Sequence, residues 1–290
     1  MTATAPKPNG RRAKAALLGN RARDATFLCY HSITDGGPPF LSLPPETFER
    51  QLAGMRRRGF VGGDLAALAA LVEGRRAIRR HVFLTFDDGY VDNHDAALPL
   101  LAAYGFPAIV FVLPSYVDRA ARFDWPEVAQ NAQAMPDIMR SLDWAMVDKM
   151  AERGIEFGSH TSSHPHLTQL GDEALREELW SSRERLRSRL GRCDVLAYPF
   201  GEWNRRVAAA AAEAGYSYAL SLPAGSPGEA SNLAIPRINV DYRDRAPRFA
   251  AKLSPLGRRV YLSGLGASLR TLSRARRSTP IGRVLRGHSP

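Results

Sequence analysis

The chain has 290 residues, enough for one large α/β domain, and its apolar and charged fractions are ordinary for a globular protein. This composition excludes fibrous, repeat-array and wholly disordered proteins. The two cysteines, Cys29 and Cys193, form neither a CxxC pair nor a zinc-type cluster. We therefore expect two buried thiols and no dependence on disulfides.

The net charge of +11 is concentrated at the two ends of the chain. Residues 243–290 contain twelve Lys or Arg residues and one acid, and the first 23 residues contain six and none. A high pI often indicates binding to nucleic acid or an anionic membrane, but here that indication applies only to the ends. We divide the chain into a basic leader (1–24), a catalytic domain (25–242) and a basic amphipathic tail (243–290).

The sequence predicts no signal peptide, because no apolar stretch of the needed length follows the basic N-terminus. The uncharged stretch Ala96–Val117 is long enough to span a bilayer, but proline and glycine interrupt it. We interpret it as the end of a helix, a turn and a buried strand. The protein is therefore expected to be cytoplasmic, with no transmembrane helix, and its tail could place it on the inner face of the membrane.

From residue 25 onward, short apolar runs alternate with helical patterns. The strand patterns lie, in chain order, at Ala25–Tyr30, Val82–Phe86, Ala108–Leu113, Ile155–Gly158, Val195–Tyr198, Tyr216–Leu220 and Leu233–Val240. The helical patterns lie at Pro45–Arg58, Tyr90–Tyr104, Leu142–Arg153, Asp172–Leu190 and Arg205–Ala214. This alternation is typical of a parallel sheet covered by helices, either open or closed into a barrel. In both architectures, active residues gather at the C-terminal ends of the strands.

Two adjacent carboxylates follow the strand pattern that ends at Phe86. Asp87 and Asp88 are succeeded by Gly89, which permits a tight turn. Because neighbouring residues of a regular strand point to opposite sides, the turn must redirect one carboxylate. One carboxylate could then bind a metal ion while the other stays free as a base, whereas a single Asp would favour a helix N-cap.

Two histidines, His160 and His164, lie four residues apart just after another strand pattern. They can face the same way on a helical turn, and neutral imidazole is the commonest metal ligand. With the Asp pair they predict a site of one carboxylate and two imidazoles, which leaves positions for water and a substrate oxygen. Non-haem iron oxygenases use the same ligand set, so the ligands alone leave the reaction open.

Several motifs occur in a fixed order, and three of them are T-F-D-D-G at Thr85–Gly89, S-H-T-S-S-H at Ser159–His164 and Y-P-F-G at Tyr198–Gly201. On these motifs the sequence resembles the polysaccharide deacetylase family, the carbohydrate esterases with a NodB-like homology domain. Two further stretches resemble a branch that includes poly-N-acetylglucosamine deacetylases: L-C-Y-H-S-I at Leu28–Ile33 and P-R-I-N-V at Pro236–Val240. The resemblance runs from about residue 25 to residue 240.

The resemblance implies a distorted (β/α)7 barrel as the single catalytic domain, with basic extensions at both ends. It implies that Asp88, His160 and His164 bind one divalent metal ion, with zinc expected and cobalt, nickel, manganese and iron as alternatives. Asp87 would be the general base that activates a water molecule on this metal. The backbone N–H of Phe200 would help to stabilise the oxyanion.

The sequence departs from the family pattern at two points. Many relatives have an arginine that orients the base two residues before the proline of the third motif, where this chain has Ala197. Arg237 could supply the guanidinium instead. Many relatives also use a late histidine as the general acid, and the corresponding stretch Leu233–Val240 has none. We expect His31 to take this role, because the first and last strands of a closed barrel are neighbours.

The leading functional prediction is a metal-dependent hydrolase that removes N-acetyl groups from an N-acetylhexosamine-containing polysaccharide or its lipid-linked precursor. One alternative is a small-molecule amide or imide hydrolase that uses the same metal site. Another is a non-catalytic glycan-binding or assembly protein. The four residues Asp87, Asp88, His160 and His164 favour catalysis, because mere binding does not need a free base beside a metal.

The basic tail over residues 243–290 contains apolar residues at helical spacing among its arginines. Such a segment can lie on an anionic membrane, or it can pack partly on the barrel. Nucleic-acid binding is not expected, because no recognised binding module accompanies the charge.

Overall fold

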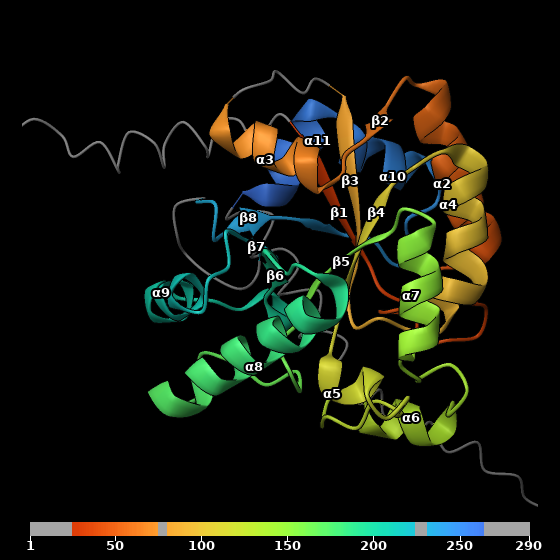
Figure 1. The fold of residues 1–290 in the computed structure, drawn as a ribbon. Helices are drawn as coiled ribbons and strands as arrows, with labels where there is room; N and C mark the ends of the chain where they lie inside the picture. The colour runs from red at the N-terminus through yellow and green to blue at the C-terminus, as the bar shows by residue number, and fades with distance from the viewer. Residues whose placement is uncertain (1–24, 75–79, 224–230, 264–290) are drawn as a thin grey trace, which may run out of the picture.

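The computed structural model describes residues 25–74, 80–223 and 231–263, whose strands form one sheet that curves into a nearly closed barrel (Figure 1). All pairings within this sheet are parallel and follow the order β8-β7-β6-β5-β4-β3-β1-β9, with β2 beside β3 off this path. The strands are β1 (Thr26–Tyr30), β2 (Val61–Gly62), β3 (His81–Phe86), β4 (Ala108–Val112), β5 (Glu156–Ser159), β6 (Val195–Ala197), β7 (Tyr218–Ser221), β8 (Ile235–Pro236) and β9 (Ile238–Asn239).

The two ends of the sheet are joined by the chain itself, because Arg237 alone separates β8 from β9. The N–H of Arg237 donates to the carbonyl of Ser221 in β7 (2.9 Å). The N–H of Val240 donates to the carbonyl of Cys29 in β1 (2.8 Å), so this segment bonds to β7 on one side and to β1 on the other. If β8 and β9 are counted as one interrupted strand, seven strand units surround the barrel in the described residues, which confirms the expected (β/α)7 architecture.

Helices surround these strands (Figure 1). They are α2 (Pro45–Arg57), α3 (Leu65–Glu73), the π-helical turn η1 (Asn93–Ala97), α4 (Leu98–Tyr104), α5 (Pro114–Val117), α6 (Ala129–Ala134), α7 (Trp144–Glu152), α8 (Asp172–Leu190), the 3-10 turn η2 (Pro199–Gly201), α9 (Arg205–Glu213), α10 (Ala246–Leu253) and α11 (Pro255–Leu262). Helix α8 ends at Gly191, whose left-handed backbone (φ 79°) is the predicted helix stop.

Alternating residues of each strand face either the barrel interior or the helices, so both faces of the sheet are buried. Figure 1 shows α3 at one end of the barrel and α5 and α6, which follow the C-terminal end of β4, at the opposite end. The interior cluster joins side chains of the strands to those of α3 and consists of Ala25, Phe27, Leu65, Leu68, Leu71, Phe83, Ile109, Phe111, Val195, Ala197, Leu220 and Ile235.

Most predicted elements agree with the structure to within a few residues, but β2, α3 and the short helices α5 and α6 were not predicted. The two-residue β2 is too short to give a strand pattern. Helix α3 is apolar over most of its surface, so it lacks the polar face that marks an amphipathic helix in a sequence. The uncharged stretch 96–117 forms the end of a helix, a turn and strand β4, as expected. None of the helices in the described ranges has both the length and the apolarity needed to cross a membrane.

The first part of the basic tail packs on the barrel. Phe249 and Leu253 of α10 are buried, and the Lys252 ammonium donates to the Asn239 carbonyl and to the Asp244 carboxylate (both 2.6 Å). The predicted leader (1–24) and the rest of the tail (264–290) lie outside the described residues.

Candidate metal centre and active site

Three predicted ligands meet at the C-terminal end of the barrel. One ligand atom each from Asp88, His160 and His164 lies within 4.8 Å of the other two. Asp88 Oδ1 is 3.4 Å from His160 Nε2 and 3.5 Å from His164 Nε2. Oxygen and nitrogen ligands about 2.0–2.1 Å from a tetrahedral zinc ion lie roughly 3.3 Å apart, so these separations match a shared cation.

A hydrogen bond at His160 Nδ1 directs the other ring nitrogen, Nε2, at Asp88. His160 Nδ1 lies 2.8 Å from the Ala197 carbonyl oxygen, which can only accept a hydrogen bond, so Nδ1 carries the proton. In the neutral ring, Nε2 then faces Asp88 Oδ1 as a second acceptor. Asp88 Oδ1 has no hydrogen-bond partner among the described residues, although it is buried. Burial disfavours the charged ring, but Asp87 and Asp88 raise the pKa of His160, so without a metal ion a proton on Nε2 can lie between the two atoms. A divalent ion that displaces this proton would be bound by Nε2 and Oδ1, which are both metal ligands.

The charge state of His164 also suits a ligand. Burial lowers its pKa to about 3, which favours the neutral ring. His164 Nδ1 has no hydrogen-bond partner in the described part of the chain, and stacking on Trp125 (centroids 4.2 Å apart, 22° between planes) orients the ring instead.

The backbone turns sharply at the aspartate pair, which brings both carboxylates to one site. Asp88 adopts a left-handed conformation (φ 69°), so its side chain leaves the strand alternation that Asp87 continues. Gly89 is also left-handed (φ 69°), and a Cβ there would lie 2.7 Å from Val112 Cγ1. The expected glycine turn therefore exists, and a larger residue would not fit at its second position.

The second carboxylate, Asp87, is bound by a fully buried guanidinium. Arg237 Nη1 donates to Asp87 Oδ1 (2.6 Å), and Arg237 Nη2 donates to Asp87 Oδ2 (2.7 Å). Burial disfavours the charged carboxylate, but Arg237 and the nearby His160 hold the pKa of Asp87 well below its usual range. Asp87 is therefore ionised at neutral pH. Its Oδ2 lies 3.9 Å from His160 Nε2, beside the predicted metal position.

His31 follows β1 directly and lies at the same end of the barrel. Its Nδ1 is buried without a hydrogen-bond partner among the described residues. The Asn93 side chain donates to the His31 carbonyl (2.8 Å), and Asp92 accepts from the Ile33 N–H (2.8 Å) and the Ser32 hydroxyl (2.6 Å). The turn after Gly89 thus holds the end of β1 in place. Burial lowers the pKa of His31, which favours the neutral ring.

Phe200 lies beside the imidazole rings of His164 and His166. Its backbone is left-handed (φ 58°), and its ring stacks on His166 (4.0 Å, 10°) and meets His164 edge-on (4.6 Å, 69°). Non-glycine residues in this conformation cluster at functional sites because the surrounding structure must hold them there. The arrangement brings the Phe200 ring against His164, one of the predicted metal ligands.

His160 and His164 both face Asp88, as predicted, but the predicted helical turn between them is wrong. Residues 160–164 form a loop, in which Thr161 (φ 70°) and His164 (φ 67°) are left-handed. Glu178 of α8 accepts from the Ser162 and Ser163 N–H groups (2.9 and 3.0 Å), so side-chain bonds replace helical ones.

The sequence did not single out two groups near the site. His166 lies between Glu127 and Glu202, with 3.0 Å from a ring nitrogen to an oxygen of each. Cys29 Sγ lies 3.3 Å from Asp87 Oδ2, although the sequence indicated only a buried thiol. The i, i+2 spacing of Cys29 and His31 on a strand could have indicated that both face the barrel interior.

A family model described as Polysaccharide deacetylase matches residues 74–219. The Bacillus subtilis (strain 168) protein YxkH, named for the same family, is 25% identical over 202 residues, which cover 69% of this chain and 65% of YxkH. The poly-beta-1,6-N-acetyl-D-glucosamine N-deacetylase of Escherichia coli (strain K12) is 22% identical over 258 residues, which cover 78% of this chain and 38% of that enzyme. The chain thus spans less than two thirds of the length of each of these relatives.

Among solved structures, the Streptococcus pyogenes deacetylase PplD in complex with acetate has a similar fold, with a TM-score of 0.67. The match covers 80% of this chain and 98% of PplD at 23% identity. At this identity the similarity shows only that the two chains share a fold. The chemistry of the site is inferred from the residues described above.

Proposed function

The chain belongs to the polysaccharide deacetylase family, and on this basis we propose that it hydrolyses the N-acetyl amide of N-acetylhexosamine units in a polysaccharide or its lipid-linked precursor. The observation that supports this most strongly is the buried group of Asp88, His160 and His164 beside a second, ionised carboxylate. A glycan-binding protein would need no such carboxylate next to a metal site.

We propose that Asp88, His160 and His164 hold one divalent cation, with zinc the first choice and cobalt, nickel, manganese and iron as alternatives. When bound, this cation polarises the amide carbonyl and makes water more acidic. His160 and His164 supply neutral nitrogens, and the hydrogen bond from His160 Nδ1 to the Ala197 carbonyl keeps Nε2 free for the ion.

Asp87 is the proposed general base, which takes the proton of the attacking water. Its hydrogen bonds to Arg237 keep it ionised and fix the direction of its oxygens. A carboxylate has about four lone-pair positions, so one remains for a proton after Arg237 has used two and the Cys29 thiol one. Arg237 is a positioning residue in this scheme. It does the work of the arginine that many relatives have at the position of Ala197.

His31 is the proposed general acid, which gives a proton to the leaving sugar nitrogen. Because burial favours its neutral form, His31 must take up a proton before each transfer. The backbone N–H of Phe200 is the proposed donor to the oxyanion, where negative charge develops as the tetrahedral intermediate forms. The left-handed backbone of Phe200 and its stacking on His166 support a fixed donor at this position.

The test is acetate release from N-acetylglucosamine oligomers by protein that has been stripped of metal and reloaded with zinc or cobalt. We expect release that depends on the metal and is lost in Asp87→Asn, while this variant still binds one metal ion. Metal binding by the wild type without acetate release would contradict a glycan deacetylase. It would instead favour a small-molecule amide hydrolase or a binding protein that retains its metal site.

We also propose a role for the basic tail at an anionic membrane surface. Leu256 and Val260 of α11 lie four residues apart on one side of the helix and are 73% and 55% exposed. Apolar side chains flanked by arginine suit the boundary between lipid headgroups and acyl chains. An enzyme at the inner face of the membrane could then reach a lipid-linked substrate.

A further inference from the structure

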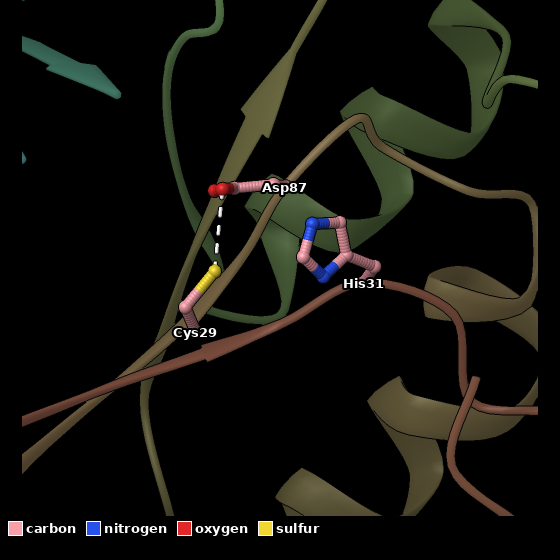
Figure 2. A group of neighbouring side chains, drawn as sticks. All are labelled: Cys29, His31 and Asp87. Carbon is pink, nitrogen blue, oxygen red and sulfur yellow. Dashed lines mark hydrogen bonds between the residues drawn. The ribbon is translucent and has the colours of Figure 1, made fainter. Parts of the chain in front are cut away.

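A second group of metal-binding side chains lies beside the first one. Cys29, His31 and Asp87 each place one ligand atom within 4.8 Å of the other two (Figure 2). Cys29 and His31 are two residues apart at the end of β1, so both face the barrel interior. Asp87 holds the matching position after the neighbouring strand β3, where its N–H donates to the Tyr30 carbonyl (2.9 Å).

The donor set and its spacing suit a cation that prefers sulfur. Figure 2 shows the contact between Cys29 Sγ and Asp87 Oδ2, which are 3.3 Å apart. Zinc bonds of about 2.3 Å to sulfur and about 2.1 Å to oxygen, at a tetrahedral angle, put the two ligand atoms roughly 3.6 Å apart. His31 has a buried ring nitrogen without a hydrogen-bond partner in the described residues, and the side chain as a whole is only partly buried. The group therefore meets solvent at His31.

We propose that Cys29, His31 and Asp87 form a second, inhibitory site for a thiophilic divalent cation such as Zn²⁺ or Cd²⁺. On binding, the Cys29 thiol loses its proton to the solvent buffer, and the thiolate, a ring nitrogen of His31 and an oxygen of Asp87 coordinate the ion. The ion then occupies lone pairs of the proposed base and the proposed acid together. The inhibition rests on the proposed function, whereas the binding does not.

The second site should bind more weakly than the first one. Arg237 donates to both oxygens of Asp87, so its positive charge repels a cation at this position. Burial, with a contribution from Asp87, keeps the pKa of Cys29 well above its ordinary value, so the cation must displace a proton. Thiolate affinity compensates for these costs only for soft ions, and Mg²⁺ or Mn²⁺, which prefer oxygen ligands, should leave the site empty.

The binding test is a titration of the metal-stripped full-length protein with Cd²⁺. The signal monitored is the near-ultraviolet charge-transfer absorption of a cadmium–thiolate bond. We expect this absorption to grow as the second equivalent is added. Cys29→Ser, which keeps the side-chain volume, should abolish it, and Cys193→Ser, which changes the other buried thiol, should retain it. No such absorption in the wild type, or equal absorption in Cys29→Ser, would overturn the second site.

The inhibition test compares acetate release over a range of zinc concentrations. In the wild type and in Cys193→Ser, release should rise and then fall as zinc increases. In Cys29→Ser the fall should move to a zinc concentration at least about 10-fold higher, because one ligand has been removed. Release that falls at the same concentration in Cys29→Ser would overturn the inhibitory role. If no variant releases acetate, the proposed deacetylase function fails, and the cadmium absorption alone decides whether the site exists.

Discussion

Arg237 and Asp87, 150 residues apart in the chain, form a buried two-point ion pair. Arg237 occupies the single-residue gap between β8 and β9, and Asp87 follows β3 directly. The guanidinium also donates to the Thr85 hydroxyl (3.0 Å) and lies over the Phe111 ring (5.5 Å). The residue that interrupts the last strand is therefore the residue that orients the proposed base.

Removal of this guanidinium should destabilise the protein. Arg237→Met leaves the Asp87 carboxylate buried and unpaired, which costs about 3–5 kcal/mol. Urea denaturation of the metal-free protein measures this change. The double variant Asp87→Asn/Arg237→Met should be less destabilised than Arg237→Met alone, because no charge is left unpaired. Arg237→Lys keeps the charge without the two-point geometry, so we expect it to retain stability better than activity. Wild-type stability in Arg237→Met would contradict this account.

Replacement of His31 should slow turnover without loss of the metal. We expect His31→Gln to lower kcat by about 10²- to 10⁴-fold, the usual contribution of a general acid, with little change in KM. The matched control is His94→Gln, because His94 is partly exposed and bound to its neighbour Asp95. Kinetics and bound-metal analysis of both variants provide the measurement. Near-wild-type turnover in His31→Gln would exclude His31 as the acid.

Metal affinity should depend on His160 and not on His166. We expect His160→Ala to weaken binding of the first metal ion by more than the about 10- to 100-fold typical of outer-sphere changes, since a ligand itself is lost. His166→Gln should bind the first metal ion as tightly as the wild type, because both nitrogens of His166 already contact Glu127 and Glu202. Competition with a chromogenic chelator gives both affinities. Equal affinities in the two variants would rule out the proposed ligand set.

Asp92 should make stability depend on pH. Burial raises the pKa of Asp92 from 3.8 to about 6, despite hydrogen bonds from Ser32, Ile33 and Asn93. Because the folded-state pKa of Asp92 lies above its unfolded-state pKa, ionisation of Asp92 lowers the free energy of unfolding. This loss is complete above about pH 6 and absent below about pH 4. The shift of about two units corresponds to about 3 kcal/mol.

The measurement for Asp92 is urea denaturation of the metal-free wild type and of Asp92→Asn at about pH 4.5 and about pH 7.5. The amide side chain in Asp92→Asn cannot ionise and can still accept from the Ile33 N–H. The wild type should therefore lose stability relative to Asp92→Asn as the pH rises. A difference between the two proteins that does not change with pH would show that the ionisation of Asp92 carries no such cost.

The exposed side of α11 should strengthen membrane binding. Co-sedimentation with vesicles containing anionic lipid should weaken when salt is added, because the attraction is electrostatic. The double variant Leu256→Glu/Val260→Glu should reduce it further, since both side chains are exposed. Trp180→Glu on α8, where Trp180 is 55% exposed, is the control for an apolar surface residue elsewhere. Indifference of the wild type to vesicles would remove the membrane proposal.

Much of the site could be predicted because parallel strands carry their reactive residues at one edge. The apolar runs before Asp87 and before His160 marked two strand ends, and a parallel sheet brings such ends together. The same patterns predicted a parallel sheet covered by helices, since runs buried on both faces need helices around them, whereas the closed barrel was implied only by the family resemblance. The short last strand was predicted as one element over residues 233–240, although Arg237 divides it into β8 and β9.

The ligand types and their strand-end positions were thus determined by the sequence alone, because alternation and turn chemistry are local properties of the chain. Only the tertiary structure decided which groups touch. The two-point pairing of Arg237 with Asp87, the Cys29 contact and the His160 tautomer each join residues that are far apart in sequence. Such contacts depend on strand register and on the closure of the barrel, which are set by the packing of the whole domain and leave no local pattern.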